Sequence, residues 1–198
     1  MMRIILKYLV ENYQENLKDL FASKKAKICI VGLGYVGLPL AISFAEKGFK
    51  VFGIDIAKEK VDKINAGKSY INHISNKRLE LITKSKKLIA YNEFNHCRDV
   101  DAIILCVPTP LNKYREPNLD FIKGTLSSIS IFLKKGQILS LESTTYPGTT
   151  KEEILPKLIE IGFNIGDDFF LIYSPEREDP GNKEFDNTTI PKILGGST

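Results

Sequence analysis

The segment from Lys27 to Asp55 constrains the fold of this chain more than any other part of its sequence. Its first residues, 28–31, are continuously apolar, as in a strand that is buried on both faces of a parallel sheet. Three glycines with the spacing GxGxxG follow directly, and a second apolar strand, Lys50 to Ile54, leads into Asp55. Strand, glycine turn, helix, strand and acid in this order are typical of a dinucleotide-binding unit.

Each glycine of this turn has a separate predicted task. Gly32 permits a tight turn, Gly34 lets the main chain approach a diphosphate, and Gly37 lets the next helix pack closely on the strand. The free N–H groups and the positive dipole end at the start of this helix favour a bound anion. Tyr35 and Val36, which lie between the second and third glycines, belong to the same predicted phosphate-binding loop.

Asp55 predicts which dinucleotide is bound. Its distance from the last glycine is close to the roughly 20 residues expected for the acid that binds a ribose 2′-hydroxyl. Because a carboxylate there repels a 2′-phosphate, the predicted cofactor is NAD rather than NADP. The alternative is a glycine turn that serves packing alone. The ordered sequence of strand, glycine turn, helix, second strand and acid argues against this alternative.

The composition indicates one domain with short appendages. The chain has 198 residues, of which 43% are hydrophobic, enough to bury one substantial core but not a second full domain. The net charge of +4 is spread along the sequence and gives no support for nucleic-acid binding. The basic cluster Lys24, Lys25 and Lys27 is interpreted as a solvated linker before the first strand.

Cysteine and histidine are too few for a disulfide framework or a metal site. Cys29 and Cys106 are predicted to be buried thiols within strands, and Cys97 to lie in a loop. His73 and His96 are isolated, so no metal is expected. No apolar run near the start approaches the roughly 20 residues that span a bilayer, and we expect a cytoplasmic protein.

Residues 2–23 place apolar side chains at three- and four-residue intervals, which predicts an amphipathic helix ahead of the domain. Its apolar face could cover the domain or meet another subunit. The predicted organisation is a helical extension over residues 1–26, followed by a single domain over residues 27–198.

Strands and helices alternate through the rest of the chain. Helices are predicted over 58–66, 76–85, 119–133 and 149–161, and strands over 88–91, 102–107, 137–141 and 169–173. This alternation predicts an α/β fold of the Rossmann type, a doubly wound parallel sheet with strand order 3-2-1-4-5-6. Ligands bind beyond the carboxyl ends of such strands, so the candidate site comprises the loops 32–37, 108–111, 142–148 and 174–181.

These loops carry motifs that resemble the UDP-glucose/GDP-mannose dehydrogenase family. In order, the motifs are VGLGYVGLPLA, CVPTPL, ESTTYPGTT, YSPEREDPGN and ILGGST. The resemblance runs from about Lys27 to Thr198 and covers the N-terminal, NAD-binding part of the family. Within the family, SPEREDPGN is most similar to the branch that oxidises UDP-N-acetylhexosamines such as UDP-N-acetylglucosamine.

The resemblance implies an activity, and it also implies that part of the enzyme lies outside this sequence. Members of the family oxidise C6 of a nucleotide sugar from alcohol to carboxylate by two hydride transfers to NAD, in the synthesis of polysaccharide precursors. A homo-oligomer is expected for the full-length protein. The family's central and C-terminal domains, with their cysteine nucleophile in a GxCxPxD-like motif, have no counterpart in these residues. We therefore expect this chain to bind NAD without oxidising a nucleotide sugar.

Two loops supply candidate site residues. Pro108 and Thr109 end a strand with a rigid turn that could line the ribose side of the cofactor, or could merely stop the strand. By resemblance, Glu142 contacts the nicotinamide end of the cofactor, and Thr145 corresponds to a threonine that helps to hold a catalytic water. A hydroxyl with a pKa far above 7 orients water rather than removing a proton.

Thr145 has a second interpretation. As turn residues, Thr144 and Thr145 could cap the helix that begins near Thr149.

Three further residues complete the predicted site by resemblance. Glu176 can accept protons or hydrogen bonds in catalysis, and Arg177 can clamp an anion or a sugar hydroxyl of the substrate. Lys60 corresponds to a basic residue near the adenosine ribose, and a solvated helix lysine is the alternative. The UDP-glucose branch has a glutamate where this chain has Pro180, so glucose is the less favoured sugar. The alternatives left open are a UDP-glucose or GDP-mannose enzyme and a stand-alone NAD-binding or interaction module.

Overall fold

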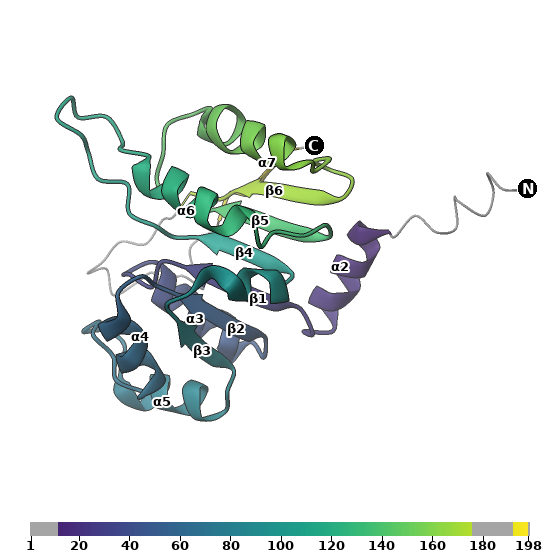
Figure 1. The fold of residues 1–198 in the computed structure, drawn as a ribbon. Helices are drawn as coiled ribbons and strands as arrows, with labels where there is room; N and C mark the ends of the chain where they lie inside the picture. The colour runs from purple at the N-terminus through teal and green to yellow at the C-terminus, as the bar shows by residue number, and fades with distance from the viewer. Residues whose placement is uncertain (1–11, 176–191, 198) are drawn as a thin grey trace, which may run out of the picture.

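A single mixed sheet of seven strands organises the computed structural model, which describes residues 12–175 and 192–197 (Figure 1). The strand order is β3-β2-β1-β4-β5-β6-β7, and all pairs are parallel except β6 with β7. This confirms the predicted Rossmann-type order and adds an antiparallel edge strand. The strands are β1 (Lys27–Val31), β2 (Lys50–Ile54), β3 (Leu88–Tyr91), β4 (Ala102–Leu105), β5 (Gln137–Leu141), β6 (Phe169–Tyr173) and β7 (Gly195–Ser197).

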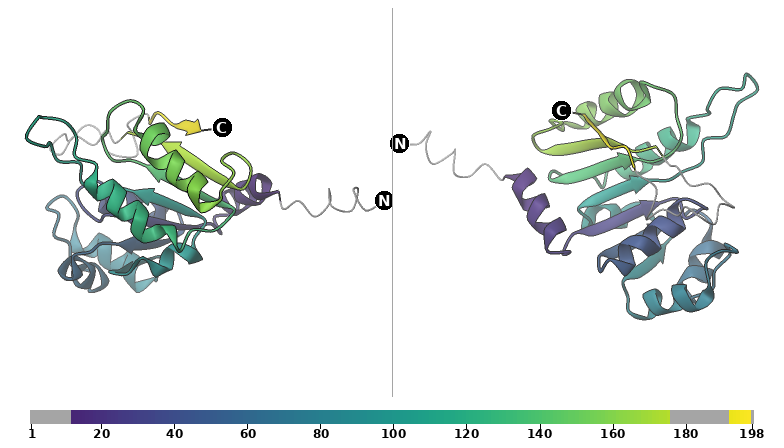
Figure 2. Two further views of the ribbon diagram at one scale, coloured as in Figure 1. Left: turned by 45° about the horizontal axis from the view of Figure 1, so that its top comes forward. Right: turned by 180° about the vertical axis from the view of Figure 1, so that it is seen from behind.

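Helices cover both faces of the sheet, as the two views in Figure 2 show. The elements α3, α4 and α5 lie against one face, and α6 and α7 lie against the other. The helices are α2 (Tyr13–Ala22), α3 (Gly37–Glu46), α4 (Lys58–Asn65), α5 (Asn76–Lys84), α6 (Asp120–Ser130) and α7 (Leu155–Ile161), with the short helices η1 (Phe94–Asp99) and η2 (Thr150–Ile154).

Strand β1 shows why the sheet is buried on both sides. Ile28 and Ile30 belong to the apolar core beneath α3, α4 and α5, whereas Cys29 and Val31 belong to the core beneath α6 and α7. Successive side chains of a strand point to opposite faces, so a continuously apolar segment feeds two cores at once. The glycine turn that follows β1 is therefore anchored from both faces of the sheet.

Helix α2 is the described part of the helix predicted over residues 2–23; residues 1–11 lie outside the described residues. Its side chain Leu17 is buried, and Phe21 packs on Phe49 with the two ring centroids 6.0 Å apart. A Cβ added to Gly136 would lie 2.7 Å from the Tyr13 ring, so α2 also touches the turn before β5. The described part of α2 thus covers the amino-end edge of the domain.

Several predicted boundaries differ from the structure for local reasons. The predicted helix over 149–161 begins as a π-helical turn, η2, and becomes α-helical only at Leu155. Pro156 lies in the first turn of α7, and it lacks the N–H that would continue an α-helical ladder through this point. The predicted strand over 102–107 ends earlier, at Leu105. Pro108 cannot donate a hydrogen bond to the sheet, and it also restricts the backbone of the residue before it.

The prediction for Cys97 was wrong. Instead of an open loop, it lies in η1 with a fully buried side chain. Burial, and a hydrogen bond between the Cys29 thiol and the sulfur of the neighbouring Cys97, raise the pKa of Cys29 well above its usual value. The Cys29 thiol is therefore a protonated core group.

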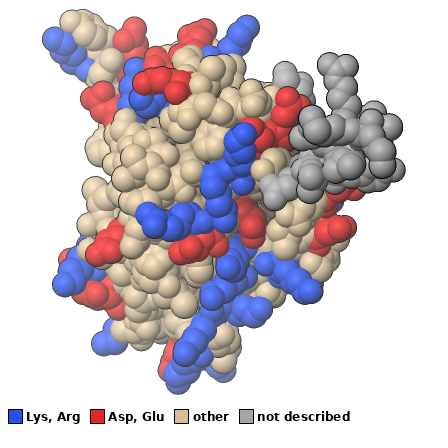
Figure 3. Space-filling model, turned by 45° about the vertical axis from the view of Figure 1, so that its right-hand side comes forward, with Lys and Arg blue, Asp and Glu red and all other residues tan. Residues whose placement is uncertain are grey.

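On the face shown in Figure 3, Lys and Arg side chains form a band through the middle and lower part, with Asp and Glu side chains beside it. Among the described residues, no helix combines the length and apolar character needed to cross a bilayer. The same residues contain no group of three or more His, Cys, Asp or Glu side chains that could hold a metal ion.

Candidate dinucleotide site

The glycine loop has the geometry that a close-fitting diphosphate needs. Gly32 has φ +92°, and a Cβ there would lie 2.5 Å from the carbonyl oxygen of Cys106. A Cβ on Gly37 would lie 1.8 Å from the carbonyl oxygen of Gly32, so α3 can approach β1 only because this residue has no side chain. Gly34, in contrast, has no atom within 4 Å of its missing Cβ. Its open side is where a ligand can approach the main chain.

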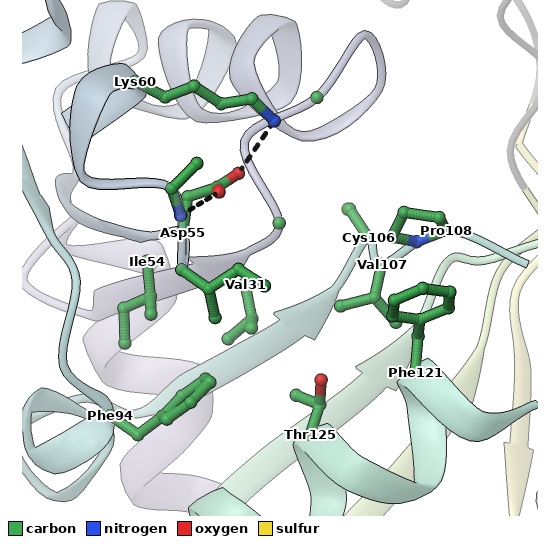
Figure 4. Close-up of a pocket in the computed structure, with 14 residues that line it drawn as sticks. Val31, Ile54, Asp55, Lys60, Phe94, Cys106, Val107, Pro108, Phe121 and Thr125 are labelled. Carbon is green, nitrogen blue, oxygen red and sulfur yellow. Dashed lines mark hydrogen bonds and ion pairs between the residues drawn. The ribbon is translucent and has the colours of Figure 1, made fainter.

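Asp55 joins the end of β2 to the glycine loop (Figure 4). It is 8% exposed, and its carboxylate accepts hydrogen bonds from the Leu33 N–H and the Ala57 N–H, each at 2.9 Å. The ammonium group of Lys60 lies 3.4 Å from the same carboxylate. The predicted residues Asp55 and Lys60 are thus brought together as an ion pair beside the loop.

Tyr70 belongs to the same cluster, although no sequence motif points to it. Its hydroxyl donates a hydrogen bond to the Leu33 carbonyl oxygen, and the Lys60 ammonium lies 5.9 Å from the centre of its ring. Burial, and then the negative charge of Asp55, raise the pKa of Tyr70 well above its usual value. The phenol is therefore a neutral donor at ordinary pH. It follows α4 in a loop without a motif, so nothing local relates it to Leu33.

A pocket of about 290 Å³ lies on the Asp55 side of the glycine loop. Asp55 and Lys60 lie at one end of it and the aromatic rings of Phe94 and Phe121 line the other sides (Figure 4). Its remaining walls are largely apolar. Apolar walls with a buried carboxylate at one end match an adenosine moiety, whose ribose hydroxyls need acceptors and whose base needs apolar contact.

A second pocket, of about 300 Å³, lies on the other side of the loop. It shares Gly34, Cys106, Val107 and Pro108 with the first pocket, so the two are halves of one cleft that passes under the glycine loop. The predicted residues Tyr35, Val36, Pro108, Thr109 and Glu142 line this second half. The cleft lies beyond the carboxyl ends of β1, β4 and β5, as the rule for such sheets requires.

Glu142 is the buried acid of the second pocket. Its side chain is 7% exposed, and its carboxylate lies 2.8 Å from the Lys192 ammonium and accepts a hydrogen bond from the Ser140 hydroxyl at 3.4 Å. Lys192 reaches it from 50 residues further along the chain. Sequence reasoning missed Lys192, because only the folded sheet brings the segment before β7 beside the end of β5.

The threonine pair after β5 is divided between two environments. Thr144 lines the second pocket, whereas Oγ1 of Thr145 is buried and makes no hydrogen bond among the described residues. Neither supplies a helix cap: the following helical segment starts at Thr149, whose own hydroxyl donates to the Tyr146 carbonyl oxygen at 2.8 Å. The predicted residues Glu176 and Arg177 lie outside the described residues.

These observations fit an extended dinucleotide. The cleft has a carboxylate at one end, an open glycine main chain and helix start in the middle, and a second polar pocket at the other end. A nucleoside, a diphosphate and a second nucleoside would occupy these three parts in turn.

Comparisons with known proteins agree with this geometry. A family model described as "UDP-glucose/GDP-mannose dehydrogenase family, NAD binding domain" matches residues 26–198. The UDP-N-acetyl-D-glucosamine 6-dehydrogenase of Salmonella typhi is 36% identical over 180 residues, which is 90% of this chain and 41% of that protein. The UDP-N-acetyl-D-mannosamine dehydrogenase of Campylobacter jejuni is 36% identical over 87% of this chain and 44% of its own length.

A solved structure of the UDP-N-acetyl-mannosamine dehydrogenase from Staphylococcus aureus superposes with a TM-score of 0.79 at 36% identity. The match covers 87% of this chain and 42% of that one. The chain thus spans about two fifths of the length of the relatives it matches. It belongs to the UDP-glucose/GDP-mannose dehydrogenase family, and residues 26–198 correspond to that family's NAD binding domain.

Proposed function

We propose that this chain is the cofactor-binding part of a dehydrogenase that oxidises the C6 alcohol of a UDP-N-acetylhexosamine to a carboxylate, at the expense of two NAD. The observation that carries this proposal is the pair of adjoining pockets beside the glycine loop, one lined by Asp55 and the other by Glu142. Relatives whose names specify UDP-N-acetylglucosamine or UDP-N-acetylmannosamine support the sugar class. The product, a sugar acid, suits the synthesis of surface polysaccharide precursors in the cytoplasm.

Each part of the cleft has a proposed share in holding the cofactor. Asp55 accepts hydrogen bonds from the adenosine ribose, with Lys60 at its side. The main chain at Gly34, Tyr35 and Val36 faces the diphosphate, and the start of α3 adds its dipole. Residues Pro108, Thr109 and Glu142 then surround the nicotinamide ribose and ring. Bound NAD supplies the hydride acceptor.

The proposed catalytic contribution of this chain is to orient water and substrate. The family resemblance assigns the water-orienting hydroxyl to Thr145, whose buried Oγ1 is without a hydrogen-bond partner among the described residues. Thr144 is the better placed of the two for this role, because it lines the nicotinamide half of the cleft. Glu176 is proposed as the acid–base group and Arg177 as a clamp for the sugar, both by resemblance.

The reaction needs more than this domain supplies. Converting an alcohol to a carboxylate removes two hydrides and adds one water, and the family uses a cysteine nucleophile between these steps. None of the three cysteines is proposed for that role: Cys29 and Cys97 are buried in the core, and Cys106 lies under the glycine loop, where the diphosphate is proposed to bind. We propose that the nucleophile and most sugar contacts belong to a substrate domain joined to this one, in a homo-oligomer.

The substrate class is tested with the polypeptide in which this domain is joined to its substrate domain. NADH formation, followed by absorbance, is compared for UDP-N-acetylglucosamine, UDP-N-acetylmannosamine, UDP-glucose and GDP-mannose. The proposal expects one of the two N-acetylhexosamine substrates to give the highest kcat/KM. Faster turnover of UDP-glucose or GDP-mannose would contradict it. NAD binding without turnover of any of the four would favour a binding or interaction module instead.

A further inference from the structure

The Glu142–Lys192 ion pair occupies an unusual place for two charges. Glu142 ends β5 and lines the second half of the cleft, and Lys192 comes from the segment before β7. The two charged groups are 2.8 Å apart, and their side chains are only 7% and 23% exposed. Taking both charges from water is costly, and such a pair is often no more stabilising than apolar side chains of the same size. Fold stability alone therefore gives little reason for it.

A second ion pair in the domain has a different setting. Lys135, whose side chain is 54% exposed, lies 2.8 Å from Asp168, whose side chain is 8% exposed. Asp168 also accepts hydrogen bonds from the Asn164 main-chain N–H at 2.8 Å and from the Asn164 side chain at 3.1 Å, so it shapes the turn before β6. This pair lines none of the cleft. The two pairs share their chemistry and differ in their relation to the cofactor site.

The charge of the nicotinamide ring differs between the two states of the cofactor. The oxidised ring carries one positive charge, and the reduced ring carries none. A charge on the pocket wall therefore acts on NAD⁺ and NADH unequally, whereas contacts with the ribose, diphosphate and carboxamide act on both alike. At an effective dielectric near 20, one unit of charge about 12 Å from the ring changes a binding constant by about tenfold, and a closer charge changes it by more.

We propose that the Glu142–Lys192 pair sets the relative affinity of the domain for NAD⁺ and NADH, because it fixes the net charge of the wall beside the nicotinamide. This inference rests on the placement of the nicotinamide in the second pocket proposed above. The carboxylate favours the oxidised ring, and the neighbouring ammonium offsets that preference. With both charges present, the pocket wall binds NAD⁺ and NADH with similar affinity.

A balanced wall suits an enzyme that performs two hydride transfers in succession. After the first transfer, NADH must leave the cleft and NAD⁺ must replace it before the second transfer can occur. A wall with an unpaired carboxylate would favour NAD⁺ strongly, and a wall with a net positive charge would retain NADH. The ion pair keeps both exchange steps accessible within one site.

The test compares four proteins: the wild-type chain, Glu142→Gln, Lys192→Met and the double variant. Dissociation constants for NAD⁺ and NADH are measured by calorimetry at one fixed pH. Glu142→Gln is expected to shift the NAD⁺/NADH affinity ratio about tenfold towards NADH, and Lys192→Met to shift it in the opposite direction. The double variant, which restores the wall's net charge, is expected to return the ratio to within about twofold of wild type.

Two controls separate a charge effect from a general loss of the site. ADP-ribose lacks the nicotinamide, so its affinity should change by less than about twofold in every variant. The matched variants Lys135→Met and Asp168→Asn alter the ion pair away from the cleft and should leave the NAD⁺/NADH ratio unchanged. An unaltered ratio in both Glu142→Gln and Lys192→Met would overturn the proposal, and so would a shift in the double variant as large as in either single variant. None of these outcomes depends on whether the joined enzyme oxidises a nucleotide sugar.

Discussion

The Tyr70 hydroxyl donates a hydrogen bond to the main-chain carbonyl of Leu33, the residue between the first two glycines of the phosphate-binding loop. The N–H of the same residue donates to Asp55 at 2.9 Å. Both polar main-chain groups of Leu33 are therefore held by side chains from other elements, and its side chain is fully buried. The shape of the loop thus depends on Tyr70 as well as on its own glycines.

Tyr70→Phe is expected to weaken NAD binding about five- to tenfold. The substitution keeps the ring but leaves the Leu33 carbonyl oxygen without its donor, at a cost of about 1–3 kcal/mol. Calorimetry with NAD and urea denaturation measure the two effects. Tyr114→Phe is the matched control, because Tyr114 is 69% exposed and should change neither quantity. Equal NAD affinities for Tyr70→Phe and the wild type would show that the loop keeps its shape without this bond.

Asp55→Asn is expected to raise the affinity for NADP relative to NAD by at least about tenfold. The change removes the charge that repels a 2′-phosphate, and the Lys60 ammonium, now 3.4 Å from Asp55, becomes available to attract it. Titrations of wild type and variant with both cofactors give the ratio. The double variant with Lys60→Met tests the role of Lys60 and should lose most of the gain. If Asp55→Asn left the NADP/NAD ratio as it is, the assignment of Asp55 would fail.

Two glycines of the same domain are predicted to respond to alanine in opposite ways. Gly37→Ala places a Cβ 1.8 Å from the Gly32 carbonyl oxygen, so it should abolish NAD binding and lower the free energy of unfolding by several kcal/mol. Gly124, within α6, has no atom within 4 Å of the added Cβ, and its φ is not in the left-handed region. Gly124→Ala should instead stabilise the domain by about 0.5–1 kcal/mol.

Urea denaturation of both alanine variants, with NAD titration, distinguishes these outcomes. A Gly37→Ala variant that bound NAD with unchanged affinity would contradict the close approach of α3 to the glycine loop.

Thr144→Val and Thr145→Val separate the two hydroxyls proposed to orient water. In the polypeptide joined to its substrate domain, Thr144→Val is expected to lower kcat by about a hundredfold, because Thr144 lines the nicotinamide half of the cleft. Thr145→Val should lower kcat less and leave stability unchanged or slightly increased, because the hydroxyl it removes is buried and has no hydrogen-bond partner among the described residues. A larger loss of kcat for Thr145→Val would assign the role to Thr145.

The sequence was sufficient to predict the features that follow from local pattern and from the rules of parallel sheets. The glycine loop, Asp55 and the strand order depend on spacing and on right-handed crossovers, and the structure agrees with each. The family resemblance alone drew attention to Lys60, as a basic residue near the adenosine ribose, and the structure places its ammonium group 3.4 Å from Asp55.

Contacts between residues that lie far apart in the sequence could not be predicted from local pattern. Tyr70 meets a residue 37 positions earlier, and Lys192 meets a residue 50 positions earlier, and neither separation leaves a periodic signal. The π-helical start of η2 arises from Pro156 within a segment whose apolar spacing still indicates a helix. Cys97 was placed in a loop because its neighbours are polar, although η1 buries its side chain beside Cys29.

The central claim is that this chain contains a complete site for NAD. Calorimetric titration of the purified 198-residue chain with NAD and with NADP tests it most directly. We predict one saturable site for NAD, at least about tenfold weaker binding of NADP, and no NADH formed when UDP-N-acetylglucosamine is added. Undetectable binding of NAD, or binding of NADP as tight as that of NAD, would contradict the account of the cleft between Asp55 and Glu142.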